Sequence, residues 1–104
     1  MGITHIENPF SPMKTQRMGP RAHLKNDVGL AIRFFREADK RGLTQGLLSS
    51  KLTLRLVELD QSAIARIELQ KRYVLDYELA AIASALRVSV AQLFAKNVLL
   101  EGLQ

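Results

Sequence analysis

The sequence predicts an all-α fold of five short helices, and three observations lead to this prediction. From position 26 onward, apolar residues recur every three or four positions, as they do on the buried face of a helix. Helix-capping side chains and Gly42 divide these stretches into short units. No convincing strand pattern is found. With 104 residues, 47% of them apolar, the chain is long enough for one modest core.

The first three helices are predicted from their caps. Asn26 or Asp27 caps the first, which ends at Gly42. Thr44 caps the second, over about 44–54, and Asp60 caps the third, over about 60–69. Gly46 inside the second helix costs about 1 kcal/mol relative to Ala. The apolar residues of the three helices are Val28, Ala31, Ile32, Phe35 and Ala38, then Leu47, Leu48 and Leu52, then Ala63, Ile64 and Ile67.

Two further helices follow. Asp76 is expected to cap the fourth, in which Leu79, Ile82, Ala83 and Leu86 form the most regular apolar stripe of the chain. Ser89 caps the fifth, which begins at Val90.

The C-terminal segment 95–104 adds more apolar surface than five short helices need. Two arrangements of this segment stay open. It either pairs two copies of the chain as a homodimer or folds back onto the first helix. The candidate interface residues are Val98, Leu99, Leu100 and Leu103.

Residues 1–25 differ from the rest and are predicted to be a flexible basic N-terminal tail. All three prolines lie there, apolar periodicity is absent, and the segment holds three of the five net positive charges. Two readings are open. The tail is either a plain disordered terminus or an arm that follows the DNA backbone or enters a minor groove.

The composition also limits the function. A net charge of +5 favours a polyanionic partner. The chain has no cysteine, and its two histidines, His5 and His23, both lie in the tail. No carboxylate pair or glycine-rich phosphate loop stands in a suitable frame, so no enzyme activity, metal or cofactor is expected. No apolar run long enough to cross a membrane and no N-terminal signal pattern are found. We therefore expect a cytoplasmic protein that does not associate with a membrane.

Several short motifs follow one another along the helical part. They are Gly42-Leu43-Thr44-Gln45, Leu48, Lys51-Leu52, Gln61-Ser62-Ala63-Ile64-Ala65-Arg66-Ile67-Glu68, Lys71-Arg72, Asp76-Tyr77-Glu78-Leu79, Ala83, Leu86, Val88-Ser89-Val90 and Leu93-Phe94. In order and spacing, residues 32–94 resemble the Cro/lambda-repressor-like (XRE-family) helix-turn-helix domains. The resemblance implies that residues 26–104 form one helix-turn-helix DNA-binding domain, with residues 61–69 as the recognition helix.

The chain also departs from the family pattern. The link between the second and third helices is several residues longer than usual, and its Leu54, Leu56 and Val57 predict either an elongated helix or an ordered loop. Gln70 and Arg87 stand where the family often has Gly, so a left-handed backbone there would be less comfortable.

The resemblance implies that the recognition helix reads DNA bases through its outward residues. These are Gln61, Ser62, Ala65 and Arg66. Gln pairs with adenine, Arg with guanine, and Ala contacts only a thymine methyl. The alternative is that these residues are an ordinary solvated helix face.

The implied phosphate contacts lie around the two central helices. They are Thr44, Gln45, Lys51, Arg55, Lys71 and Arg72. The alternative for the basic residues is a solvated charge cluster. Glu68 is expected to steady the recognition helix through a hydrogen bond or ion pair, and Tyr73 and Tyr77 are expected to pack.

The predicted function is that of a sequence-specific, DNA-binding transcriptional regulator, with repression implied by the resemblance alone. The alternative is an antitoxin-like or adaptor protein that chiefly holds another protein. The two functions differ in which surface should tolerate mutation poorly. For a regulator it is the recognition helix, and for an adaptor it is the C-terminal apolar residues.

Overall fold

The computed structural model describes residues 24–103, which form five helices and no strand. The helices are α3 (Gly29–Ala38), α4 (Gln45–Thr53), α5 (Gln61–Glu68), α6 (Asp76–Leu86) and α7 (Val90–Glu101). The predicted all-α class is confirmed for this part of the chain. The tail predicted over 1–25, with His5 and His23, lies almost wholly outside the described residues.

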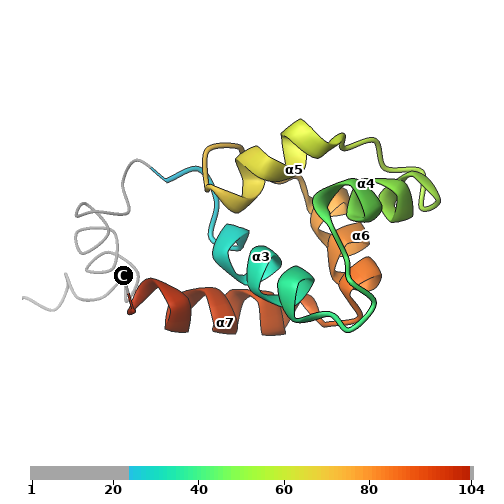
Figure 1. The fold of residues 1–104 in the computed structure, drawn as a ribbon. Coiled ribbons are helices and arrows are strands. Elements are labelled where there is room, and N and C mark those ends of the chain that lie inside the picture. Colours follow the sequence, from blue (N-terminus) through green and yellow to red (C-terminus); the bar gives the residue numbers. More distant parts are fainter. Residues whose placement is uncertain (1–23, 104) are drawn as a thin grey trace, which may run out of the picture.

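Helix α3 is the centre of the fold. Figure 1 shows it between α5 on one side and α7 on the other, with α4 and α6 grouped at its C-terminal end. The apolar residues that these helices share form one buried cluster. Its members are Val28, Ala31, Ile32, Leu43, Leu48, Leu52, Val57, Leu59, Ala63, Ile64, Ile67, Ile82, Ala83, Ala85, Leu86 and Leu93. Two predicted apolar residues, Ala38 and Leu47, are exposed instead, because Ala38 ends α3 and Leu47 lies beside the inward-facing Leu48.

Side chains cap the helices largely where the sequence predicts. Thr44 Oγ1 accepts a hydrogen bond from the Leu47 amide at 3.1 Å, and Asp60 Oδ1 accepts one from Ala63 at 2.7 Å. Ser89 and Gln92 form a reciprocal capping box, with distances of 3.0 and 2.7 Å. These caps satisfy amides that have no partner inside their own helix.

The prediction for Asp76 is wrong. Asp76 is the first residue of α6, and Leu75 occupies the cap position. The Leu75 amide donates instead to Glu78 Oε1 at 2.9 Å, because the long Glu side chain reaches back over the first turn. Asp76 still lies favourably, since a carboxylate near a helix N-terminus interacts well with the helix dipole.

The long link after α4 is an ordered loop and does not extend the helix. The Leu56 amide donates to Thr53 O at 2.9 Å and the Val57 amide to Leu52 O at 3.0 Å. This pair of bonds is a Schellman motif, in which the residue at the left-handed position is usually Gly. Here that residue is Leu56, with φ +64° and an exposed fraction of 91%.

Helices α5 and α6 end in the same way. Gln70 (φ +61°) and Arg87 (φ +62°) occupy the left-handed positions, with the Lys71 and Val88 amides closing the motifs onto Arg66 O and Ala83 O. The sequence predicts that a left-handed backbone is less comfortable for these two residues, and the structure places both in it. Three of the connections therefore carry a non-glycine residue at a strained position.

The first turn of α3 lies in very close contact with the end of α5. A Cβ added at Gly29 would lie 2.1 Å from Ile67 O, so no other residue fits without backbone movement. Asn26 bridges the same two segments. Its Oδ1 accepts hydrogen bonds from the amides of Val28 and Gly29, and its Nδ2 donates to Ile67 O at 3.1 Å and Arg72 O at 2.9 Å.

Helix α7 folds back along α3 and is fixed there by a buried Asn. Asn97, 1% exposed, accepts a hydrogen bond from the Ala31 amide at 3.0 Å and donates to Glu101 Oε2 at 3.0 Å. The predicted segment 95–104 is thus helical to Glu101. Of its four candidate interface residues, Leu100 is half-buried, while Val98, Leu99 and Leu103 are exposed.

No single helix between residues 24 and 103 is long and apolar enough to cross a membrane. Helices α6 and α7 pass the length and composition criteria only as a pair, and the chain bends by 88° between them. Within the same range, no group of three His, Cys, Asp or Glu side chains is arranged to hold a metal ion.

The strain at Leu56 gives a direct prediction. Leu56→Gly should raise the free energy of unfolding by about 0.5–1 kcal/mol, because Gly adopts the left-handed backbone without steric cost. Leu54→Gly is the matched control. Leu54 is also exposed but has right-handed helical angles, so its replacement should lower stability by a similar amount. Urea unfolding of both variants measures the difference, and equal effects would contradict the assignment.

Candidate nucleic-acid interface

Helix α5 has one buried and one exposed face. Ala63, Ile64 and Ile67 are buried, as the sequence predicts. Gln61, Ser62 and Arg66 are exposed and Ala65 is half-buried, so the four residues predicted to contact bases lie on or beside the outer face. Leu69, just after the helix, is 57% exposed.

The start of α4 lies beside the start of α5. A Cβ added at Gly46 would be 3.8 Å from Gln61 Oε1 and 3.9 Å from Thr44 Oγ1. Along α5, the Arg66 guanidinium donates to Ser62 Oγ at 2.9 Å in an exposed contact. The structure therefore brings Gln61, Ser62 and Arg66 together with Thr44 on one surface.

Beneath this surface, a buried carboxylate joins three helices. Glu68 of α5, 3% exposed, accepts two hydrogen bonds from Arg36 of α3, at 2.6 Å from Nε and 3.0 Å from Nη2. Arg36 also donates to Leu43 O at 3.1 Å. The hydrogen bond with Glu68 raises the pKa of Arg36 although burial lowers it, so the guanidinium keeps its charge. The expected structural role of Glu68 is thus observed.

Gln45 belongs to the same network. Its Nε2 donates to Glu68 Oε1 at 2.9 Å, so the first residue of α4 is tied to the end of α5. Gln45 remains half-exposed beside a hollow of about 220 Å³. The hollow is lined by Arg33, Arg36, Gln45, Ala65, Glu68 and Leu69.

The other predicted phosphate contacts are less uniformly placed. Lys71 is exposed directly after α5, and Lys51 is half-buried on α4. Arg55 donates to Ser84 Oγ at 3.1 Å, so its side chain is directed at α6. Arg72 donates to both carboxylate oxygens of Glu78, at 3.0 and 3.2 Å, and to Tyr73 O.

The pairing of Arg72 with Glu78 explains why a second buried carboxyl group, that of Glu78, is ionised. Burial by itself raises the pKa of Glu78. Hydrogen bonds from Arg72 and the Leu75 amide, together with the charge of Arg72, outweigh burial and leave the pKa below its ordinary value. Glu78 is therefore held as a carboxylate, which keeps Arg72 in place.

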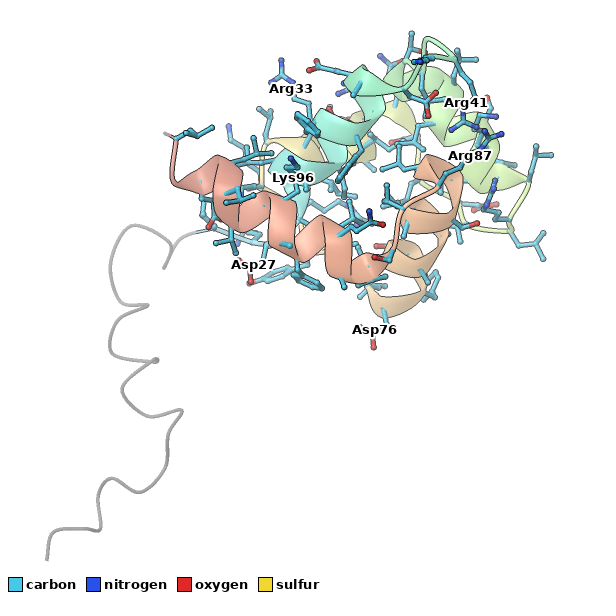
Figure 2. The ribbon with its side chains drawn as sticks, turned by 90° about the horizontal axis from the view of Figure 1, so that it is seen from below. Asp27, Arg33, Arg41, Asp76, Arg87 and Lys96 are labelled. Atoms are coloured by element: carbon cyan, nitrogen blue, oxygen red, sulfur yellow. The ribbon has the colours of Figure 1, made fainter. Side chains whose placement is uncertain are left out.

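Sequence reasoning missed several residues around this surface. Arg33 projects from α3 in Figure 2, and both Arg33 and Arg36 line the hollow. A signal existed for Arg36, since it lies four positions after the buried Ile32 on a helix whose inner face is otherwise apolar. Figure 2 also shows Arg41 and Arg87 close together at another end of the molecule, where Arg41 pairs with Asp39.

The expectation that Tyr73 and Tyr77 pack inside is wrong. They are 66% and 61% exposed. Tyr73 lies on the loop after α5, where Lys25 Nζ sits 5.1 Å from its ring centroid. Tyr77 is the second residue of α6, whose buried positions start at Glu78.

No family model, curated protein or solved structure matches the chain. The likeness to helix-turn-helix domains therefore stays a prediction from the order of the motifs. What the structure adds is the arrangement of five helices in which α4 and α5 are packed together and the outer face of α5 is left uncovered by the described residues.

The Glu68 network should dominate the stability of this region. Glu68→Gln is expected to lower the free energy of unfolding by about 3–5 kcal/mol, because it removes the buried partner of Arg36 and leaves only the exposed Glu37, 3.8 Å away. Gln45→Ala, which removes one hydrogen bond from the same carboxylate, should cost about 1 kcal/mol. Denaturant unfolding measures both variants, and equal losses would show that the charge pair is unimportant.

The Arg72–Glu78 pair should make stability depend on pH. Glu78 has a lowered folded pKa, so its contribution is present above its unfolded pKa and is lost as pH falls through the folded value. Arg72→Ala should therefore destabilise most at neutral pH, and its effect should shrink below about pH 4. Lys71→Ala, an exposed neighbour, is the control and should show little effect at either pH. A constant Arg72→Ala effect between pH 7 and 3 would contradict the pairing.

Proposed function

We propose that this chain is a sequence-specific DNA-binding transcriptional regulator of the cytoplasm that inserts α5 into the major groove. One observation carries the proposal. Helix α5 is held on its inner side by the core and by Glu68, while its outer face presents Gln61, Ser62 and Arg66 together. Repression is proposed on the family resemblance alone.

The exposed side chains suit base recognition. A Gln amide pairs with N6 and N7 of adenine, and an Arg guanidinium pairs with O6 and N7 of guanine. With eight residues, α5 is roughly 12 Å long, comparable to the width of the major groove. Arg66 would exchange its exposed bond with Ser62 for a base contact at small cost, because both groups are already solvated.

The flanking groups suit the DNA backbone. The free amides at the N-terminus of α4, beside Thr44 and Gln45, form an electropositive end that attracts a phosphate. Lys71 adds positive charge directly after α5. Arg33 on α3 contributes less, because its guanidinium pairs with Glu37 at 3.1 Å. Arg72 is expected to contribute less to phosphate binding, because its guanidinium is hydrogen-bonded to Glu78.

Selection of binding sites from random duplex DNA tests the proposal. The wild-type chain should enrich a defined motif. Gln61→Ala/Arg66→Ala should relax that motif at the positions read, each contact being worth about 1–3 kcal/mol of discrimination. Arg87→Gly is the control, because it also removes one positive charge but lies at the C-terminal end of α6. An unchanged motif in the double variant would contradict the assignment of α5.

Lys71→Ala separates positioning from recognition. It should weaken binding to all sequences alike, leave the selected motif unchanged and reduce the slope of log K against log salt by about 1. Fluorescence anisotropy at several salt concentrations measures the slope. A changed motif would place Lys71 on the bases instead of the backbone.

One observation favours the alternative function of an antitoxin-like or adaptor protein. Val98, Leu99 and Leu103 are large, apolar and exposed on or just after α7. The adaptor function replaces the proposal if the wild-type chain enriches no DNA motif and shows only weak, salt-sensitive binding. Such binding would mean that the basic residues attract DNA nonspecifically.

A further inference from the structure

Two hollows adjoin each other between α4, the loop after it and the start of α6. Their volumes are about 430 and 490 Å³. The first reaches Asp60, the second is lined by Leu56 and Tyr77, and both are lined by Thr53 and Glu58. We call the two hollows together the α4–α6 groove. Its loop is the link that is longer than in the helix-turn-helix pattern, so the resemblance does not account for this groove.

The α4–α6 groove combines apolar side chains with negative charge. Leu56 and Tyr77 are 91% and 61% exposed at its wall. The Glu58 carboxylate is exposed and forms no hydrogen bond or ion pair with any residue between 24 and 103. Asp60, also exposed, caps α5 with one of its carboxylate oxygens. A nucleic acid would be repelled from this surface, whereas a peptide with basic and apolar side chains is complementary to it.

The chain carries a peptide of this chemistry in its own N-terminal segment, residues 1–23. The basic side chains of the segment outnumber its acidic ones by three to one. Met13 directly precedes Lys14, and Met18 directly follows Arg17, so apolar and basic groups occur together. The unbranched methionine side chain adapts well to an irregular apolar surface. In charge and in apolar content, the segment matches the α4–α6 groove.

The N-terminal segment joins the described fold close to the groove. Asn26 Nδ2 donates to Arg72 O at 2.9 Å, which fixes the junction at the loop between α5 and α6. The hydrogen bond with Glu78 raises the pKa of Arg72 against the effect of burial, and charge interactions with Tyr77 and Asp60 add to the increase. Arg72 is therefore near both the junction and two groove residues. Residues 1–23 extend to roughly 75 Å at most, so the segment is long enough to reach the groove.

We propose that the α4–α6 groove binds residues 13–21 of the same chain, with basic side chains against Glu58 and apolar ones against Leu56 and Tyr77. Exposed ion pairs are individually weak and are screened by salt. The covalent connection offsets this weakness, because it holds the segment at an effective concentration on the order of millimolar. The contact should therefore form in the free chain at low salt and weaken as salt is added.

Paramagnetic relaxation in the full chain tests the contact. The chain has no cysteine, so Ser11→Cys carries a single nitroxide label. The amide signals of residues 53–60 and of Tyr77 should lose several-fold more intensity than those of α7. No such loss should occur when a spin-labelled chain is mixed with an isotope-labelled chain that bears no nitroxide, because the contact is within one chain. A loss centred on α7, or one spread evenly over the surface, would overturn the inference.

Charge reversal in the groove separates binding from chance proximity. In the spin-labelled chain, Glu58→Lys should abolish the selective loss of intensity. Because Glu58 is exposed and unpaired among the described residues, the variant should keep the circular dichroism spectrum of the wild type. Glu37→Lys is the matched control, since it also reverses an exposed carboxylate but lies on α3. Equal effects of the two substitutions, or an unchanged loss in Glu58→Lys, would overturn the inference.

The apolar wall of the groove is tested by Leu56→Gly. This variant should stabilise the fold and yet reduce the selective loss of intensity about two-fold, because the side chain that covers the methionines is gone. Leu54→Gly, at an exposed leucine that does not line either hollow, should leave the loss unchanged. An undiminished loss in Leu56→Gly would contradict the apolar part of the contact.

The inference about the α4–α6 groove does not depend on the proposed DNA binding, because it is tested in the free chain. Selective intensity loss in a chain that enriches no DNA motif would support the groove contact and contradict the proposed function. Site selection without intensity loss in the free chain would do the reverse, and would favour the N-terminal segment as an arm on DNA.

Discussion

The buried N-terminus of α3 is the constraint on which the other helices depend. The first amides of a helix have no partner within it, and inside a protein they cannot turn to water. In α3, Asn26 accepts from two of them and Asn97 from a third, the Ala31 amide. Each Asn also fixes another helix. Asn26 donates to the end of α5, and Asn97 belongs to α7. Satisfying three hydrogen-bond donors thereby positions α5 and α7 around α3, and Gly29 allows the close approach that this requires.

The two buried carboxylates determine which arginines are available to contact DNA. A carboxylate in the interior needs a paired charge, and Glu68 and Glu78 take Arg36 and Arg72 for this purpose. Arginines paired in this way hold helices in place, and their charge contributes less to the surface field. A count of basic residues near the proposed recognition helix therefore overstates the charge available to DNA. Arg66 and Lys71 remain exposed, and the salt dependence of binding should reflect such residues.

Local signals account for what the sequence predicts well. The caps Thr44, Asp60 and Ser89 and the buried face of α5 follow from rules that involve only neighbouring residues. The features that it misses depend on contacts between distant segments. Nothing near Asn97 predicts that it accepts from the Ala31 amide, 66 positions away, and nothing near Arg36 predicts that it pairs with Glu68, 32 positions away. Leu56 shows a third limit, because the turn after α4 forces a left-handed conformation that leucine itself disfavours.

Helices α5 and α7 are connected through α3. Helix α5 is tied to it by Asn26 and Arg36, and α7 is tied to it by Asn97. The outer face of α5, which is proposed to read bases, is therefore positioned by side chains on its inner side and by a helix that contacts no base in the proposal. A substitution that changes how α5 packs on α3 would displace the proposed reading face, and would alter DNA binding without removing any group that contacts DNA.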